Sequence, residues 1–201
     1  MKLRSTFVAS LIALATTAGI ANAQTTTTEP RSTTTGFHVG AALNGSSLDL
    51  TDSDTDIEAE GGSGATITAG YGFTPRIGLL LSLTGASMNS GEYGLGQVDI
   101  AGRYSFANPD RALVPYFELG FSGLALVADD ADQTEISGSG FTGAAGLNFF
   151  FNPNLALDVN FRFTAGEFTR FSSGGETVES DDGIGATTGR FNLGISWFPG
   201  G

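Results

Sequence analysis

Residues 154–168 alternate apolar and polar side chains at every second position, and this pattern constrains the fold more than any other feature. The apolar set is Leu155, Leu157, Val159, Phe161, Phe163 and Ala165, and the polar set is Asp158, Asn160, Arg162, Thr164 and Gly166. Successive side chains of a strand point to opposite faces, so the segment is predicted to form a strand with one apolar face. A helix would mix Asp158 and Arg162 with the phenylalanines.

Seven further segments carry a similar alternation, which predicts eight strands in all. The others are residues 36–47, 64–74, 77–88, 95–106, 114–127, 140–151 and about 190–197. Three short turns, at Pro75, Pro109 and Pro153, alternate with four longer loops, of which those at residues 48–63, about 128–139 and 169–184 are acidic. An even number of strands places both termini at the end that carries the short turns.

The N-terminus has the features of a secretory signal peptide. A basic start with Lys2 and Arg4 precedes an apolar run at residues 7–15, and small residues end at Ala23, which predicts cleavage before Gln24. The following Thr-rich stretch has no apolar pattern. The chain is therefore predicted to contain a signal peptide (residues 1–23), a flexible leader (24–35) and a barrel domain (36–201). The absence of cysteine excludes disulfides and a lipidated cysteine.

The charge and hydropathy of the chain exclude two broad classes. Nine basic residues oppose 21 acidic ones, and the net charge of −12 excludes a general nucleic-acid binder, which would carry a basic surface. No segment after the signal approaches the ~20 apolar residues of a spanning helix. Any membrane-spanning role therefore requires strands.

Aromatic residues gather at the strand ends nearest the termini and the short turns. They are Phe37, Phe73, Phe106, Phe117, Phe149, Phe151 and Trp197. Transmembrane barrels have such interfacial girdles, together with short periplasmic turns, long outer loops and strands that are apolar outward. A soluble barrel would bury the apolar face instead, but here the other face is rich in Gly, Ala, Thr and Asn, which suit a narrow lumen. We therefore predict an all-β fold, an eight-stranded antiparallel up-and-down transmembrane β-barrel.

The signal peptide, the eight strands and the aromatic last strand ending in Trp197-Phe198 resemble a known family. It is the family of small outer-membrane barrels of the OmpA transmembrane-domain and OmpX type. The resemblance implies a bacterial outer membrane containing lipopolysaccharide, extracellular loops and periplasmic termini. It also implies that the barrel-assembly machinery reads Trp197 or Phe198 as its signal. This class shares architecture more than activity.

Three acids and three bases fall on the inward faces of the predicted strands. They are Asp99, Arg103, Glu118, Asp158, Arg162 and Arg190. Charges in a narrow lumen need partners, and counting back from the turn at Pro109 places Arg103 opposite Glu118. Two interpretations remain open: a closed, neutral polar core or a narrow gated conduit.

Catalysis and metal binding have one candidate each. Barrel enzymes that resemble this fold use a histidine near the outer rim, whereas the only histidine, His38, lies near the turns, so we expect no enzyme. A run of alternating acids in the first loop is a candidate for weak Ca²⁺ or Mg²⁺ binding, against the alternative of a solvated loop. It consists of Asp52, Asp54, Asp56, Glu58 and Glu60. We expect no other cofactor.

The expected function is a structural one. We predict a monomeric, non-enzymatic barrel that supports the envelope and presents acidic extracellular loops to a surface partner. The sequence does not identify that loop ligand. The alternative is a narrow channel for small solutes.

Overall fold

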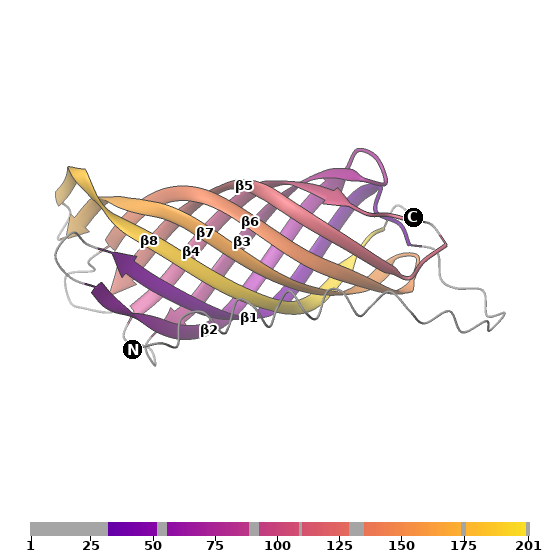
Figure 1. Ribbon diagram of the computed structural model, residues 1–201, viewed down its shortest axis with the longest axis horizontal. Coiled ribbons are helices and arrows are strands. Elements are labelled where there is room, and N and C mark those ends of the chain that lie inside the picture. The colour runs from indigo at the N-terminus through magenta and orange to yellow at the C-terminus, as the bar shows by residue number, and fades with distance from the viewer. Residues whose placement is uncertain are drawn as a thin grey trace.

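Eight antiparallel strands form one closed barrel in chain order (Figure 1). The computed structural model describes residues 32–51, 56–88, 93–108, 110–128, 135–173 and 176–199. The strands are β1 (Gly36–Thr51), β2 (Asp56–Gly72), β3 (Ile77–Met88), β4 (Tyr93–Ser105), β5 (Leu113–Ala128), β6 (Glu135–Asn152), β7 (Leu155–Ser173) and β8 (Glu176–Trp197). The predicted eight-stranded, all-β barrel is thereby confirmed. Over these residues, no helix is long and apolar enough to cross a membrane.

The two ends of the barrel differ in their connections. The β2–β3, β4–β5 and β6–β7 connections lie at the end where β1 begins and β8 stops, at the right of Figure 1, and we call this the turn end. The connections at the opposite, loop end fall in residues 52–55, 89–92, 129–134 and 174–175, outside the described residues. Strand β8 closes the barrel by pairing with β1, from Val39 opposite Trp197 to Thr51 opposite Gly185.

Side chains within the short connections accept hydrogen bonds from nearby backbone amides. The Thr74 Oγ1 accepts from the Ile77 N–H at 3.0 Å, and the Asn152 Oδ1 accepts from the Asn154 N–H at 3.0 Å. Such local bonds mimic a backbone turn, which is why Asn and Thr favour these positions. The short connections therefore have their own sequence signals.

The strands reach further toward the loop end than predicted. Strand β2 begins at Asp56 and β8 at Glu176, so most of the loops expected at residues 48–63 and 169–184 is strand, and that prediction is wrong. The reason is that the prediction required an apolar residue at every second position. Backbone pairing needs no such pattern, and it continues past Leu48 and Phe168 across register shifts.

Part of the expected leader lies against the turn end. The Ser32 Oγ donates to the Asn108 carbonyl at 3.2 Å, and the Thr34 Oγ1 donates to the Pro75 carbonyl at 2.6 Å. Residues 32–34 thus contact two of the three short connections. Residues 24–31 and the expected signal peptide, residues 1–23, lie outside the described residues, so cleavage before Gln24 stays a prediction.

The two faces of the sheet have the polarity of a membrane barrel. Leu43 is 75% exposed and Phe141 70%, whereas the polar side chains Glu118 and Arg190 are each 1% exposed. A water-soluble protein shows the reverse distribution. All seven expected girdle aromatics are exposed: Phe37, Phe73, Phe106, Phe117, Phe149, Phe151 and Trp197.

Candidate functional site in the barrel lumen

The six inward charges form one connected network inside the barrel. Glu118 on β5 lies at its centre, because its two oxygens bind different arginines. The Arg103 Nη2 lies 2.6 Å from the Glu118 Oε1, and the Arg162 Nη2 donates to the Glu118 Oε2. Arg103 lies directly opposite Glu118 in the register of β4 and β5, the position that the sequence predicted.

The network continues in both directions from Glu118. On the loop side, Asp99 Oδ2 lies 3.7 Å from the Arg162 Nε and 2.7 Å from the Arg190 Nη2. On the turn side, the Arg103 Nη2 lies 4.0 Å from the Asp158 Oδ2. Acids and bases therefore alternate along one path: Asp158, Arg103, Glu118, Arg162, Asp99 and Arg190.

The strand register explains why this path includes a pair of like charges. Arg162 on β7 and Arg190 on β8 lie directly opposite each other, an arrangement that is unfavourable in isolation. Asp99 lies between them from β4 and contacts both. Because Asp99 and Arg190 are each 1% exposed, each charge depends on its partner instead of water.

Neutral polar groups complete the coordination of Asp158. The Tyr116 hydroxyl lies 2.9 Å from both carboxylate oxygens, and the Asn160 Nδ2 donates to one of them at 2.6 Å. The Arg103 guanidinium lies 3.9 Å from the centre of the Tyr116 ring. Gly146 makes room for this ring, since an added Cβ would lie 2.5 Å from the Tyr116 Cζ.

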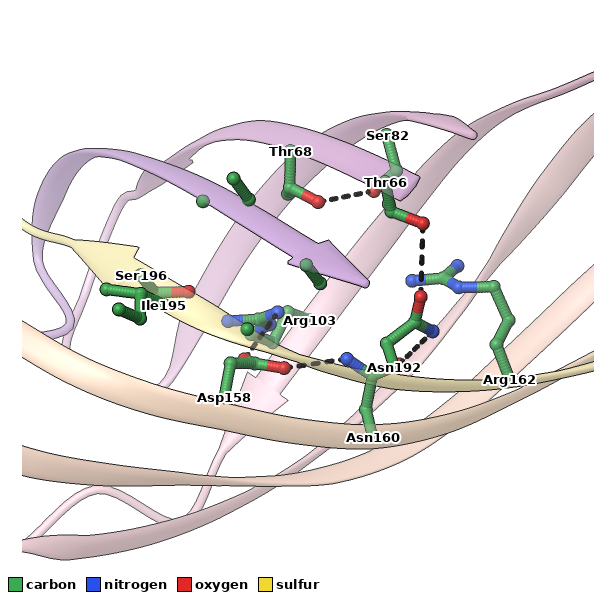
Figure 2. A pocket seen from close by; sticks show the side chains of 14 residues that line it. Thr66, Thr68, Ser82, Arg103, Asp158, Asn160, Arg162, Asn192, Ile195 and Ser196 are labelled. Atoms are coloured by element: carbon green, nitrogen blue, oxygen red, sulfur yellow. Dashed lines mark hydrogen bonds and ion pairs between the residues drawn. The ribbon is translucent and has the colours of Figure 1, made fainter. Parts of the chain in front are cut away.

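A chain of amides and hydroxyls on the inner face bridges past β1, from Asn160 and Asn192 to Thr66 (Figure 2). The Asn192 Nδ2 donates to the Asn160 Oδ1 at 2.9 Å, and the Thr66 hydroxyl donates to the Asn192 Oδ1 at 3.0 Å. Thr66 also lies 3.0 Å from the Thr84 hydroxyl, which accepts from the Arg190 Nη1 at 2.5 Å. The chain thus joins β7 and β8 to β2 and β3.

A polar cavity of about 30 Å³ lies on the turn side of this chain. Figure 2 shows Arg103, Asp158 and Ser196 at its wall, and Gly40 and Gly194 also line it. A cavity of this size has room for about two water molecules. It is too small for an organic ligand.

Two apolar clusters inside the barrel were missed by the sequence reasoning. The cluster near the loop end contains Leu48, Ala86, Met88, Leu95, Leu124, Leu126, Phe168 and Ala186. The cluster near the turn end contains Val114, Phe150, Ala156 and Phe198. Strand parity could have revealed the first, because Leu95 lies two residues from the inward Gln97 and therefore shares its face. The lumen is therefore polar in its middle and apolar toward both ends.

The two candidates for the assembly signal lie on different sides of the wall. Trp197 continues the outward set of β8 and is 50% exposed, whereas Phe198 is 1% exposed and belongs to the turn-end cluster. Phe198 stacks on His38, with ring centroids 5.0 Å apart, and contacts Phe150. His38 therefore lines the lumen near the turn end, where the sequence placed it. Neither of its ring nitrogens has a hydrogen-bond partner among the described residues.

The candidate metal ligands lie largely outside the described residues. This applies to Asp52, Asp54 and the side chains of Asp56 and Glu58. The Glu60 carboxylate accepts a hydrogen bond from the Tyr93 hydroxyl. In the part of the chain that the structure describes, no three His, Cys, Asp or Glu side chains are grouped to hold a metal ion.

The closed barrel, its apolar exterior and its charged lumen define a membrane-spanning β-barrel of the outer-membrane type. The model of the outer membrane protein beta-barrel domain matches residues 11–197, and the chain belongs to this family. The protein is therefore a bacterial outer-membrane barrel, as the resemblance had implied.

Solved structures support the same fold at low sequence identity. Neisserial surface protein A aligns with a TM-score of 0.60 and 17% identity, covering 81% of this chain and 97% of its own. OprG from Pseudomonas aeruginosa aligns with a TM-score of 0.55 and 10% identity, covering 84% of this chain and 98% of its own. No curated protein matches the chain. At these identities the likeness concerns the fold alone.

Proposed function

We propose that the protein is a closed structural barrel that presents its acidic loop end at the cell surface. The observation that carries this proposal is the self-paired lumen: six inward charges, five of them buried and Arg103 nearly so, neutralise one another between two apolar clusters. In this arrangement the loop end is extracellular and the termini are periplasmic. The barrel works as a monomer without catalysis.

A conduit would require a continuous polar path that ions or solutes can follow. The inward charges contact one another across the barrel. Separating a buried pair leaves a charge without its partner, at a typical cost of ~3–5 kcal/mol. The cluster around Leu95 and Phe168 adds an apolar constriction near the loop end, and such constrictions oppose the passage of water and ions. Both features favour a closed barrel.

The alternative is a narrow channel for small solutes, and the cavity beside Arg103 and Asp158 is the feature that favours it. The cavity lies on the turn side of the network. A solute that entered it would still have to pass Glu118, Asp99 and the loop-end apolar cluster. We therefore rank the channel second.

Planar-bilayer conductance distinguishes the two functions. The purified barrel is inserted into bilayers, with a porin as the control for insertion and detection. We expect no stable openings, because the loop-end apolar cluster, the charge network around Glu118 and the turn-end apolar cluster all lie across the lumen. Reproducible unitary openings that scale with protein concentration would overturn the closed barrel and favour the channel.

The acidic rim supports the proposed surface role. Asp49, Glu60, Glu135 and Glu167 lie toward the loop end of their strands, and further acids lie beyond the described residues. We propose that the rim binds Ca²⁺ or Mg²⁺ weakly through Asp52, Asp54, Asp56, Glu58 and Glu60, linking loops to one another or to lipopolysaccharide phosphates. We also propose that the assembly machinery reads Trp197, because it is the terminal aromatic that faces lipid.

A further inference from the structure

The chain crosses the turn end of the barrel before it enters β1. The Thr34 Oγ1 donates to the Pro75 carbonyl in the β2–β3 connection at 2.6 Å. The Ser32 Oγ donates to the Asn108 carbonyl in the β4–β5 connection at 3.2 Å. Because the strands follow one another around the wall, residues 32–35 run along the turn end from β5 back to β1. We call these four residues the strap.

Two glycines let the strap approach the barrel closely. Gly36 has a φ of 89°, in the left-handed region that other residues rarely adopt, and there the chain turns from the strap into β1. Gly72 at the end of β2 is buried and is paired with Gly36. A Cβ added to Gly72 would collide with the Thr34 carbonyl oxygen and would lie 3.1 Å from the Thr35 Cα. The path of the strap is therefore set by the backbone as well as by two hydroxyls.

The strap lies over the part of the mouth that inward side chains leave unfilled. On β2 to β4, the inward positions nearest the turn end hold Gly72, Gly78 and Ser105, which share a face with Arg103 in the strand register. The other side of the mouth is filled by the turn-end apolar cluster, which consists of Val114, Phe150, Ala156 and Phe198. Small residues on one side and large ones on the other leave a one-sided opening, and the strap covers it.

Phe198 closes the filled side of the mouth and is held firmly. Its N–H donates to the Asn154 carbonyl, and its own carbonyl accepts from the Asn154 Nδ2, each at 2.7 Å. Its ring contacts His38 and Phe150, with ring centroids 5.0 and 5.2 Å away. The closure of the turn end thus has two parts, Phe198 from the C-terminal end of the chain and the strap from the N-terminal end.

A small cavity of about 10 Å³ lies where the strap and the charge network meet. Thr34 and Phe198 line it, and so does Arg103 from the network. Arg103 also lines the larger polar cavity beside Asp158. On this side of the mouth, the strap is therefore the layer between the water at the turn end and the nearest arginine of the network.

The contacts that hold the strap are of a kind that opens locally. Its hydroxyl bonds join neutral groups, and the bond from Thr34 is exposed to water. Such bonds are individually weak, and a short segment held by them opens while the rest of the fold stays intact. Phe198, by contrast, is 1% exposed within an apolar cluster. The two parts of the closure therefore differ in how readily they open.

We propose that residues 32–35 are a releasable strap that seals the turn-end mouth of the lumen. Its release, with the barrel and Phe198 in place, opens the space beneath Thr34 to water as far as Arg103. The strap lies outside the charge network, so this proposal does not rest on whether the network blocks conduction.

Thiol labelling tests the strap, because the chain has no cysteine. Ser105→Cys places a reporter at the wall of the small cavity, and Ser122→Cys places a second buried reporter further toward the loop end. In each background, the Ser32→Ala/Thr34→Ala double variant removes both hydroxyl donors of the strap. Thr35→Ala, at an exposed position of the strap, is the matched control. The proteins are folded in micelles and treated with a water-soluble, negatively charged methanethiosulfonate.

We expect Ser105→Cys to react slowly in the intact barrel and about tenfold faster once both hydroxyl donors are removed, because reaction then follows opening of the strap. Thr35→Ala should leave the rate unchanged, and Ser122→Cys should react slowly in every variant. Equal rates of Ser105→Cys with and without the two hydroxyls would overturn the proposal. Faster labelling of both reporters would overturn it as well, because the whole barrel would then have opened.

A second variant acts on the backbone of the strap. Gly72→Ala places a Cβ where the Thr34 carbonyl lies, so the strap has to move away. It should accelerate the labelling of Ser105→Cys and leave that of Ser122→Cys unchanged. Unboiled protein should still migrate apart from boiled protein in a gel, as a closed barrel does. Continued protection of Ser105→Cys in an intact Gly72→Ala barrel would show that the strap is not the seal.

Discussion

The barrel can be divided at the level of Leu83 and Phe121 into a turn half and a loop half. The two halves use the same strands but different stabilising forces. The turn half has an interior of ion pairs and hydrogen bonds around Glu118, ending in the small apolar cluster that contains Phe150 and Phe198, with leucine and phenylalanine outside. The loop half has an interior of leucine, methionine and phenylalanine, with glycine and serine outside. The alternation of side chains is constant along each strand. What changes along each strand is the kind of side chain that each face carries.

Truncation of an inward leucine should produce the largest loss in the loop half. Leu95 is 1% exposed within the apolar cluster, and Leu95→Ala should cost about 2–5 kcal/mol through lost burial and a residual cavity. Leu83→Ala, on the outward face, leaves no cavity and should cost less. Urea unfolding of both variants in lipid vesicles measures the difference. Equal losses would show that the loop-end interior is not a packed core.

Introduction of arginine on the outer face should separate the halves again. Leu81→Arg and Leu157→Arg place a charge in the apolar band and should cost about 2–4 kcal/mol. Ser87→Arg lies on the outward face at the loop end of β3 and should cost about 0–1 kcal/mol, the range found near a membrane interface. The same unfolding assay measures all three. A cost at Ser87 equal to that at Leu81 would contradict an apolar outer band that ends before Ser87.

The smallest expected effect concerns the acids at the tip of the loop half. Weak binding of Ca²⁺, in the millimolar range of extracellular calcium modules, should shift the amide resonances of residues 52–60. An NMR titration with CaCl₂ in micelles, against NaCl of matched ionic strength, measures this. The backbone amide resonances of the residues around Leu81, in the middle of β3, serve as the internal reference. Identical responses to the two salts would leave the rim as a solvated acidic surface.

Strand parity made most of the turn half predictable from sequence. The alternation around Asp158 and Arg162 assigns each side chain to a face, and the short turn at Pro109 sets Arg103 opposite Glu118. The contacts of Glu118 with Arg162, and of Asp99 with Arg190, cross the lumen between strands that are not neighbours in the sheet. Such contacts depend on the stagger of the closed barrel, which no local pattern encodes.

The loop half escaped prediction for a different reason. Its residues at 56–63 and 176–184 carry no apolar alternation and were therefore expected to be loop, although they are strand. Parity would have assigned Leu95 and Phe168 to the inward face, but the prediction did not follow the apolar residues on that face. Similarly, Trp197 and Phe198 are equally aromatic in sequence. Strand parity nevertheless separates them, because Phe198 follows the inward Ser196 by two residues and Trp197 follows the outward Ile195 by two.

The central claim is that the lumen charges of the turn half hold one another, and a double-mutant cycle on Arg103 and Glu118 tests it most directly. Glu118→Ala leaves Arg103 and Arg162 without their shared carboxylate partner and should cost about 3–5 kcal/mol. Arg103→Ala should also be destabilising. As the control, Glu118→Ala is combined with Thr68→Ala, whose hydroxyl pairs with Ser82 outside the network.

The control pair should be additive within about 0.5 kcal/mol. The Arg103→Ala/Glu118→Ala double variant should lose less stability than the two single losses together, by more than about 1 kcal/mol. Additive losses in this pair, in a barrel that still folds, would contradict the self-paired lumen on which the closed barrel rests.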